Sequence, residues 1–251
     1  MTLIRSGISK IRVIDYDIVT LSSLNRHAFA MRSDVGKLKV RVVKEYANKI
    51  NPNLIIETID DAFIAEYADK YLLKDKPDYI VDCIDDLDAK CDLIKFCYDN
   101  KLMLISSMGA GAKCDPTSIR VADFHFVQGD TLAKRLRYLY KKKFSVAIPN
   151  FKTIYSIEKS SKKLTELEDH QKENPEMYRI NDNERVRSLP VFASIPAIFG
   201  QSIAAVVLTD LAKQPINFSN EKEPSVSQEV MIGNVTLKKL YEEYKANESK
   251  R

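Results

Sequence analysis

The sequence predicts an α/β fold built on a doubly wound, mostly parallel sheet of the Rossmann-like type. Two observations predict it. Between residues 10 and 106, short apolar runs rich in β-branched residues alternate with segments whose apolar residues recur at helical spacing. Two of these runs also end in acidic side chains, at the sheet edge where such folds bind ligands. We therefore expect the element order β-α-β-α-β-α-β.

The first strand of this chain is expected at Lys10–Ile14, and a helix follows it. Ser33 or Asp34 can cap this helix, because a side-chain oxygen there accepts a backbone N–H of the first turn. Its apolar positions at helical spacing are Val35, Leu38, Val42 and Tyr46. The turn Asn51–Pro52–Asn53 ends the helix.

The same alternation continues through the rest of the predicted core. The expected elements are a strand at Leu54–Ile59, a helix at Ala62–Leu73, a buried strand at Tyr79–Ile84, a helix at Leu87–Asn100 and a strand at Leu102–Ser106. We expect residues 1–125 to form a nucleotide-binding core.

The pattern becomes less regular after this core, and we expect residues 126–251 to complete the same domain. The expected parts are a short strand at Ser118–Ala122, a basic helix at Gly129–Lys143, a charged insert at 158–188, a buried helix at 191–211, a strand at Gln228–Gly233 and a final helix at Val235–Lys245. The insert is polar and shows little periodicity, so we expect it to be mobile.

The composition is that of an ordinary globular protein, with 45% hydrophobic residues, 29% charged residues and a net charge of +4. Its cysteines form no CxxC pair, which disfavours a zinc site and predicts reduced, mostly buried thiols in an intracellular protein. They are Cys83, Cys91, Cys97 and Cys114. No run reaches the roughly 18 apolar residues of a membrane span, and no secretory signal opens the chain.

Several charged side chains lie where this fold binds nucleotides. Asp15 ends the first strand, where a carboxylate can accept both hydroxyls of a ribose, and Asp17 follows it. Asn25 and Arg26 lie in the next loop, where an arginine can hold a polyphosphate through two hydrogen bonds. Lys39 lies on the following helix and partly faces the sheet, so it needs either a phosphate or a carboxylate as partner.

Three acids, Asp82, Asp85 and Asp86, end the strand expected at 79–84. Asp85 is the candidate to hold Mg²⁺ between phosphate oxygens, because Mg²⁺ in nucleotide sites commonly uses one or two carboxylates. It is also the candidate carboxylate partner of Lys39. We expect Asp86 to cap the helix that follows.

The basic helix gives two open interpretations. Its charged residues form either a solvated face or an electrostatic patch for a nucleic-acid backbone. They are Lys134, Arg135, Arg137, Lys141, Lys142 and Lys143. His27, His125 and Cys114 are expected to be ordinary surface or structural residues.

The order of these residues resembles one known family. The segments IRVIDYDIVTLSSLNRHAF, VGKLKV, INPN and DYIVDCIDD, and later LPVFASIPAIFGQSIAAVVL, are similar to the ThiF-type adenylating family. That family includes ubiquitin-activating E1 enzymes and bacterial activators of sulfur-carrier proteins. Within it, SMGAGAKCDPT and the strand after it are most similar to the branch of tRNA threonylcarbamoyladenosine dehydratases.

The resemblance implies ATP and Mg²⁺ as cofactors and tRNA carrying threonylcarbamoyladenosine at position 37 as substrate. ATP adenylates the substrate carboxylate, and an internal nitrogen then closes a ring and expels AMP. By this resemblance the ATP-binding residues are Asp15, Asp17, Asn25, Arg26, Lys39 and Asp85, of which Arg26, Lys39 and Asp85 are catalytic and Asp85 holds the metal. A homodimer, no DNA partner and a place at the mitochondrial outer membrane are also implied.

The first strand and the glycine-rich phosphate loop of this family have no counterpart before Asp15. We therefore expect a natural protein that is longer at its N-terminus, a fragment, or an incomplete gene model. The alternative is a genuine short form whose sheet is rearranged.

Three other functions remain open from the sequence. One is an activator of a ubiquitin-like or sulfur-carrier protein, although such enzymes commonly contain a CxxC pair. A second is a non-catalytic subunit that binds tRNA or a partner, which the missing phosphate loop favours. The third is an NAD-dependent oxidoreductase, which an arginine–lysine–acid set suits less well than it suits a triphosphate.

Overall fold

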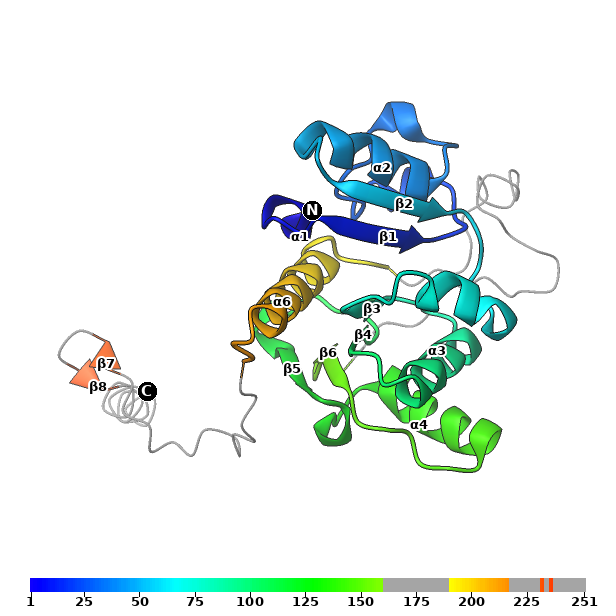
Figure 1. The fold of residues 1–251 in the computed structure, drawn as a ribbon. Coiled ribbons are helices and arrows are strands. Elements are labelled where there is room, and N and C mark those ends of the chain that lie inside the picture. Colours follow the sequence, from blue (N-terminus) through cyan, green and yellow to red (C-terminus); the bar gives the residue numbers. More distant parts are fainter. Residues whose placement is uncertain (160–189, 217–230, 233–234, 237–251) are drawn as a thin grey trace, which may run out of the picture. The chain divides into compact units, whose positions relative to one another are not determined.

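The computed structural model describes residues 1–159, 190–216, 231–232 and 235–236 of the 251-residue chain. The chain divides into two compact units, Met1–Ile216 and Asn217–Arg251. The first unit is mixed α/β, with mostly parallel strand pairing and helices around the strands (Figure 1). The predicted fold class is confirmed.

The strands of the first unit form two sheets. In the first sheet, β1 (Lys10–Ile14) pairs in parallel with β2 (Ile55–Ile59), and Val13 lies opposite Thr58. The second sheet has the order β3-β4-β6-β5. Its strands are β3 (Ile80–Asp82), β4 (Leu104–Ser107), β5 (Ile119–Asp123) and β6 (Lys152–Ser156). In the described part of the chain, β1 and β3 are each an edge strand of their sheet.

Parallel pairing in the second sheet joins β3, β4 and β6, whereas β5 runs antiparallel to β6. The strand β6 has no counterpart among the elements expected from the sequence. Its residues Thr153, Ile154, Tyr155 and Ser156 are all buried, so it is a central strand without the polar–apolar alternation of a half-exposed one.

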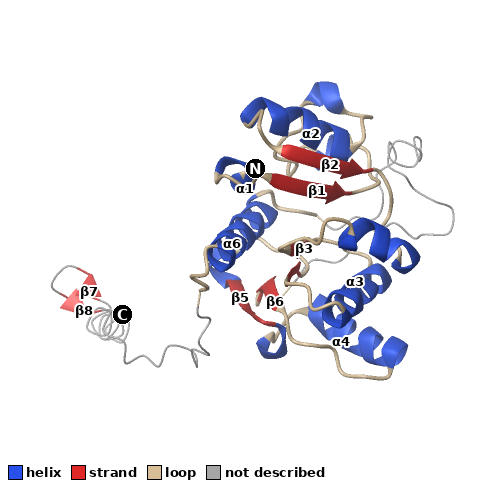
Figure 2. Cartoon of the chain, viewed as in Figure 1, coloured by secondary structure: helices blue, strands red, loops and turns tan. Residues whose placement is uncertain are grey.

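Helices cover these sheets (Figure 2). The helices are α1 (Thr2–Arg5), α2 (Lys39–Ile50), α3 (Leu87–Asp99), α4 (Thr131–Phe144) and α6 (Ser194–Leu211). The helix α2 packs on β2 of the first sheet. The helices α3 and α4 pack on one another. The helices α3, α4 and α6 confirm the expected positions to within a few residues.

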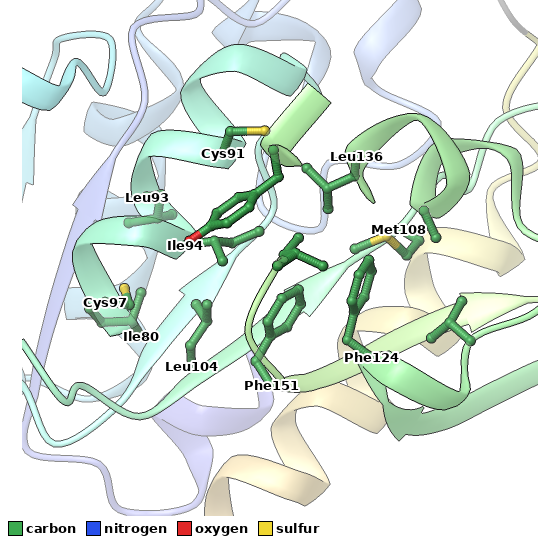
Figure 3. Close-up of a cluster of buried hydrophobic side chains, with 14 of the residues drawn as sticks. Ile80, Cys91, Leu93, Ile94, Cys97, Leu104, Met108, Phe124, Leu136 and Phe151 are labelled. Carbon is green, nitrogen blue, oxygen red and sulfur yellow. The ribbon is translucent and has the colours of Figure 1, made fainter. Parts of the chain in front are cut away.

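The main hydrophobic core lies between α3, α4 and one face of the second sheet (Figure 3). Leu104 of β4 belongs to this core, and its neighbour Ile105 is fully buried on the opposite face, as alternation along a strand requires. The rings of Phe124 and Phe151 stack in the core with their centroids 4.6 Å apart. Such a pair adds about 0.5–1.5 kcal/mol beyond the area that it buries.

The helix α6 packs against β4, β6 and α1. At its C-terminal end, the buried carboxylate of Asp210 accepts hydrogen bonds from Lys152 Nζ at 2.6 Å and from Tyr79 Oη at 2.8 Å. By length and composition alone α6 could cross a membrane, and among the described residues it is the one helix that could. Its contacts with the sheet are those of a core helix.

The helix predicted from Ser33 or Asp34 begins later, at Lys39. Asp34 does not cap it. Its carboxylate instead accepts the N–H of Met31 and pairs with Lys37 at 2.8 Å, in a single 3₁₀ turn. Gly36 then adopts a left-handed conformation with φ of +91°, which breaks the helical path before Lys39.

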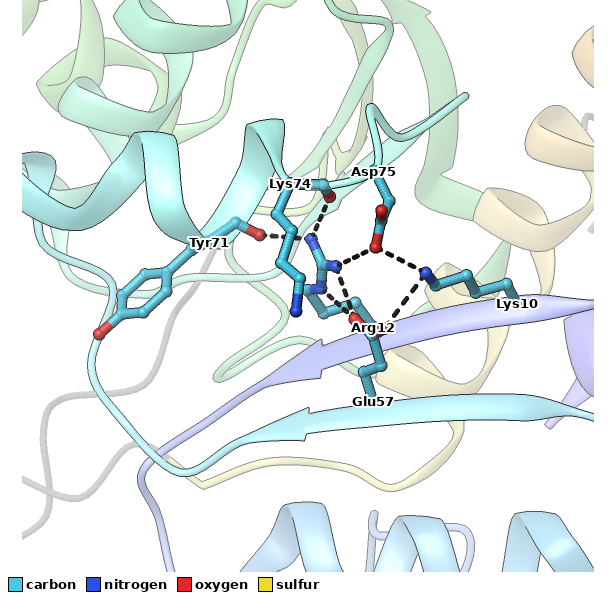
Figure 4. A network of polar contacts seen from close by, with 6 residues as sticks. All are labelled: Lys10, Arg12, Glu57, Tyr71, Lys74 and Asp75. Atoms are coloured by element: carbon cyan, nitrogen blue, oxygen red, sulfur yellow. Dashed lines mark hydrogen bonds and ion pairs between the residues drawn. The ribbon is translucent and has the colours of Figure 1, made fainter.

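The helix predicted at Ala62–Leu73 is wrong as a regular helix. A 3₁₀ turn covers Ala65–Tyr67 and a wide π-type turn covers Asp69–Leu73. The guanidinium of Arg12 donates hydrogen bonds to the carbonyl oxygens of Tyr71 and Lys74, at 2.9 and 2.8 Å (Figure 4). These carbonyl groups lie at the end of the segment, so Arg12 pairs with acceptors that the last turn leaves without an intrahelical partner.

Most of the charged insert expected at 158–188 lies outside the described residues, as does most of the final helix expected at Val235–Lys245. In the second unit, β7 (Met231–Ile232) lies within the strand expected at Gln228–Gly233. It pairs antiparallel with β8 (Val235–Thr236), so the first two residues of the expected final helix form a strand.

Candidate active site

A cavity of about 220 Å³ lies beyond the end of β1, against the start of α2. It is lined by Val13, Asp15, Ser23, Arg26, His27, Lys39, Val40 and Val43. We call it the first cavity. Whole small-molecule pockets measure roughly 300–1,000 Å³, so this cavity is smaller than a complete small-molecule site. Three of the residues predicted to bind a nucleotide meet here.

Asp15 is half-buried and fixed by the backbone around it. Its N–H donates to the carbonyl of Ile59 at 3.1 Å, and its Oδ1 accepts the N–H of Asp17 at 2.8 Å. Among the described residues, Oδ2 has no hydrogen-bond partner. One carboxylate oxygen is therefore left to accept a hydroxyl group in the cavity.

Lys39 is held by Asp17 through both its backbone and its side chain. Its Nζ lies 2.6 Å from Asp17 Oδ2, and its N–H donates to the Asp17 carbonyl at 2.9 Å. A backbone hydrogen bond joins the segment before α2 to the segment after β1, because the Val19 N–H donates to the Lys37 carbonyl. Asp85 was one candidate carboxylate partner of Lys39, beside a phosphate, and in the structure Asp17 takes that place.

A tight turn sets the direction of the loop that carries Arg26. The Ser23 hydroxyl accepts the N–H of Thr20 at 3.0 Å and donates to its carbonyl at 2.8 Å. Arg26 is exposed, and its Nη1 donates to the Ser22 carbonyl and to Asn25 Oδ1, at 2.9 and 3.0 Å. The remaining guanidinium N–H groups face no protein acceptor in the described residues, so they can bind an anion.

A second cavity of about 360 Å³ adjoins the first and shares Arg26 and His27 with it. Its other lining residues are Leu24, Asn25, Ala28, Ala193, Ser194 and Ala197. The side chain of Asn25 donates to the Val191 carbonyl at 3.0 Å, which ties the loop to the segment before α6. Asn25 therefore lies on the second cavity rather than the first.

The three acids after β3 have separate roles. Asp86 caps α3 by accepting the N–H of Ala89 at 2.8 Å, as expected. Asp82 is buried and pairs with the equally buried Lys90 at 2.7 Å. Asp85 is exposed, lines neither cavity, and has no side-chain partner among the described residues. No group of three or more metal-ligating side chains occurs in the described ranges.

His27 is a lining residue that the sequence interpretation missed. It is half-buried, lines both cavities, and its Nδ1 accepts the N–H of Ala30 at 3.0 Å. Burial, and next the positive charge of Lys39, lower its pKa below the ordinary value. Its position directly after Arg26 was the available signal. His125 is an ordinary residue, with Nε2 3.3 Å from the Ile148 carbonyl.

The basic helix α4 presents only part of its charge to solvent. Arg137 donates to the Phe124 and Val127 carbonyls, both at 2.8 Å, and its guanidinium lies over the Phe124 ring. Lys143 pairs with Asp92 of α3 at 2.8 Å. These two residues join α4 to its neighbours, and the side chain of Arg137 is half-buried. The exposed basic residues are Lys134, Arg135, Lys141, Lys142 and Lys143.

All four cysteines are free thiols, two of them buried and two exposed. Burial raises the pKa of Cys91 to about 11 and that of Cys97 to about 12. Cys114 contacts Glu158, with its Sγ 3.6 Å from the carboxylate. The two buried thiols are therefore protonated at neutral pH and unsuited to act as nucleophiles.

The sequence matches the ThiF family over residues 1–248. The chain is a member of the ThiF family. Its relatives include tRNA threonylcarbamoyladenosine dehydratase 2 of Saccharomyces cerevisiae, 37% identical over 222 residues, which cover 86% of this chain and 49% of the relative. The Haemophilus influenzae tRNA threonylcarbamoyladenosine dehydratase is 36% identical over 156 residues, covering 62% of this chain and 59% of that protein. The chain thus spans about half the length of the yeast relative.

A solved structure shares the fold. The E. coli tRNA N6-threonylcarbamoyladenosine dehydratase in complex with AMP matches with a TM-score of 0.70 and 28% identity, over 84% of this chain and 79% of that one. The same E. coli protein in complex with ATP matches with a TM-score of 0.67. The ThiF-type fold of this chain is therefore one that holds adenine nucleotides in a relative.

Proposed function

We propose that this protein is an ATP-dependent tRNA threonylcarbamoyladenosine dehydratase, which cyclises threonylcarbamoyladenosine in tRNA through an acyl-adenylate. One observation carries the proposal. Asp15 from the end of β1, Arg26 from the loop and Lys39 from the start of α2 line the same cavity. Relatives named for this reaction, and structures of one of them with AMP and ATP, support it.

The proposed roles follow from charge and position. Asp15 accepts a ribose hydroxyl through its unpartnered oxygen, and Lys39 and Arg26 bind phosphate oxygens. The apolar wall of Val13, Val40 and Val43 faces the nucleotide. Asp17 does not line the cavity, so we assign it the role of holding Lys39 in place.

Mg²⁺ is part of the proposal, with Asp85 as its protein ligand. Asp85 fits because it is exposed beyond the carboxyl end of β3 and has no side-chain partner in the described residues. The ion would supply positive charge to the phosphates, which lowers the cost of bringing two anions together.

The proposed reaction has two steps. The substrate carboxylate attacks the α-phosphorus of ATP, which forms the acyl-adenylate and expels pyrophosphate. An internal nitrogen of the substrate then attacks the activated carbonyl and loses its proton, the ring closes, and AMP leaves. The cationic groups Arg26 and Lys39 act in the first step, where a carboxylate approaches a polyphosphate.

Substrate and partner assignments belong to the same proposal. The exposed bases of α4 are positioned to attract the tRNA backbone, because each released counterion adds to affinity. A homodimer, an intracellular location and a place at the mitochondrial outer membrane stay predictions from the family resemblance.

Two variants test the site. Lys39→Ala and Asp85→Ala should each lower AMP release with threonylcarbamoyl-modified tRNA by about a hundredfold or more, as removal of transition-state charge stabilisation does. Lys44→Ala is the matched control, since Lys44 is an exposed lysine on the same helix as Lys39. Unchanged turnover in both variants would refute the site. If the wild-type protein binds the modified tRNA but turns over no ATP, this result would instead support a non-catalytic subunit.

A further inference from the structure

We propose that the second cavity holds the acyl group of the substrate and that His27 donates a hydrogen bond from Nε2 to its carboxyl group. This inference rests on the proposed function, because it assigns the substrate side of the same site. Its ligand class is a carboxylate-bearing acyl chain joined to, or about to be joined to, the α-phosphate of an adenine nucleotide.

The two cavities adjoin one another. They share Arg26 and His27, so a ligand can extend from one into the other past these two side chains. The second cavity measures about 360 Å³, within the range of small-molecule sites. Adenylation requires a carboxylate beside the α-phosphate, and an adjoining cavity of this size provides that place.

The hydrogen bond to Nδ1 sets the tautomer of His27. Because Nδ1 accepts the N–H of Ala30, it carries no proton, and the neutral ring is protonated at Nε2. Nε2 has no partner in the described part of the chain. The charged groups around it are Lys39, Asp15 and Asp34, and burial together with Lys39 favours the neutral ring by lowering its pKa. His27 therefore offers one N–H donor at the junction.

The remaining lining suits a short polar acyl chain. Ala193 and Ala197 of the opposite wall are small, so they leave room between the loop and α6. The Ser194 hydroxyl is buried and has no hydrogen-bond partner among the described residues. Buried hydroxyls are rarely left unpaired, so this group is available to a ligand. Arg26 supplies the positive charge that a carboxylate needs.

The test compares AMP with a stable mimic of the acyl-adenylate, 5′-O-sulfamoyladenosine joined to N-carbamoylthreonine, by titration calorimetry. If the inference holds, AMP contacts the first cavity and does not enter the second, whereas the conjugate reaches into both. Ala197→Leu narrows only the second cavity, and Ala205→Leu is its control on an exposed position of the same helix outside either lining. His27→Ala removes the donor, and His27→Gln restores an N–H donor near the place of Nε2.

The wild-type protein should bind the conjugate more tightly than AMP. His27→Ala should reduce that preference by about tenfold, the loss expected for one hydrogen bond to a charged group, and His27→Gln should restore most of it. Ala197→Leu should also reduce the preference, because its larger side chain fills space in the second cavity. Ala205→Leu should leave the preference unchanged. A wild-type protein without any preference for the conjugate, or variants that weaken AMP and conjugate by the same factor, would overturn the inference.

The proposed function has a separate readout, formation of the cyclic nucleoside in modified tRNA. Absence of that product from a protein that still prefers the conjugate would contradict the reaction and not the acyl subsite. A normal yield of product from a protein without the preference would contradict the subsite and not the reaction.

Discussion

Asp17 and Lys39 show how a single pair organises the candidate site. Lys39 lies at the first residue of α2, and both its N–H and its ammonium group bind Asp17. The sequence could predict that this lysine needs a partner, because a lysine facing a sheet is not left unpaired. It could not identify the partner, since the choice between Asp17 and Asp85 depends on backbone hydrogen bonds between the segment after β1 and the segment before α2. Helical spacing does not predict such hydrogen bonds.

The buried pair of Lys90 and Asp82 is the clearest residue-scale determinant of stability. Both side chains are fully buried, and Asp82 also accepts hydrogen bonds from Ser106 Oγ at 2.6 Å and from the Ile84 N–H at 2.9 Å. The pair fixes the turn that leads to Asp85. We infer that it positions the metal-binding carboxylate of the proposed site.

Lys90→Met should destabilise the protein by about 3–5 kcal/mol, because it leaves the Asp82 carboxylate buried without its counterion. Urea unfolding followed by circular dichroism measures the effect. The control is Lys49→Met, which removes an exposed pair with Glu45 on α2 and should change stability little. Equal, small effects in both variants would show that the buried pair does not stabilise the fold.

At the scale of elements, Arg12 joins β1 to the turn before β3. It binds Glu57 on β2 through Nε at 2.8 Å and two carbonyls of the 71–74 segment, and Lys10 binds Asp75 at 2.9 Å. Hydrogen bonds from Arg12, and then Lys10, lower the pKa of Glu57, and the hydrogen bond from Lys10 lowers the pKa of Asp75. This polar network connects the first sheet to the segment that enters the second.

A lowered pKa in the folded state means that the two carboxylates stabilise the fold while they are ionised. Their contribution is complete above the ordinary values of 4.5 for Glu57 and 3.8 for Asp75, and it is lost as pH falls through the lower folded-state pKa. Arg12→Gln should therefore lower the Tm at pH 7 and flatten the loss of Tm between pH 5 and 3. A difference in Tm between the two proteins that stays the same across this range would contradict the proposed role of the network.

The elements that the sequence predicted well are those with a strong local pattern. The strands β1 and β2 are short β-branched apolar runs, the helices α3 and α4 have apolar residues at helical spacing, and Asp86 caps α3 as predicted. Two predictions failed. The segment after Ala62 forms a 3₁₀ turn and a π-type turn in place of one helix, and α2 starts late because Gly36 breaks the helical path. The strand β6 was missed because a fully buried strand lacks polar alternation.

The sequence also predicted part of the candidate site. Asp15, Arg26 and Lys39 do meet at one cavity, since strand ends and helix starts of this fold converge at one edge of the sheet. The position of His27 on both cavities was missed, because the second cavity is formed with the α6 segment, which is distant in sequence. Only the folded chain brings that loop and that helix together.

At the scale of the whole molecule, the distribution of positive charge links the fold to its proposed substrate. The helix α4 is fixed at its start by Asp130, which caps it and pairs with the buried Lys113 at 2.7 Å. Arg137 and Lys143 fix its inner side. The exposed bases are thus held on a rigid element, as a surface for a phosphate backbone requires.

A double variant, Lys141→Ala with Lys142→Ala, should weaken tRNA binding and lower the slope of log K against log salt concentration by about 2, because each lysine that neutralises a phosphate group adds about one to that slope. Filter binding across a salt series measures both quantities. Lys44→Ala with Lys49→Ala removes the same charge from α2 and should leave the slope unchanged. Equal slopes in the two double variants would place the tRNA surface elsewhere.

Formation of the cyclic nucleoside distinguishes a dehydratase from a protein that only binds tRNA. The protein is incubated with ATP, Mg²⁺ and tRNA carrying threonylcarbamoyladenosine, and nucleosides and nucleotides are quantified by mass spectrometry, with tRNA lacking the modification as control. We expect one cyclic nucleoside for each AMP released, and neither product with the control tRNA. Folded protein that binds the modified tRNA yet forms no cyclic nucleoside, or AMP release that does not depend on the modification, would contradict this expectation.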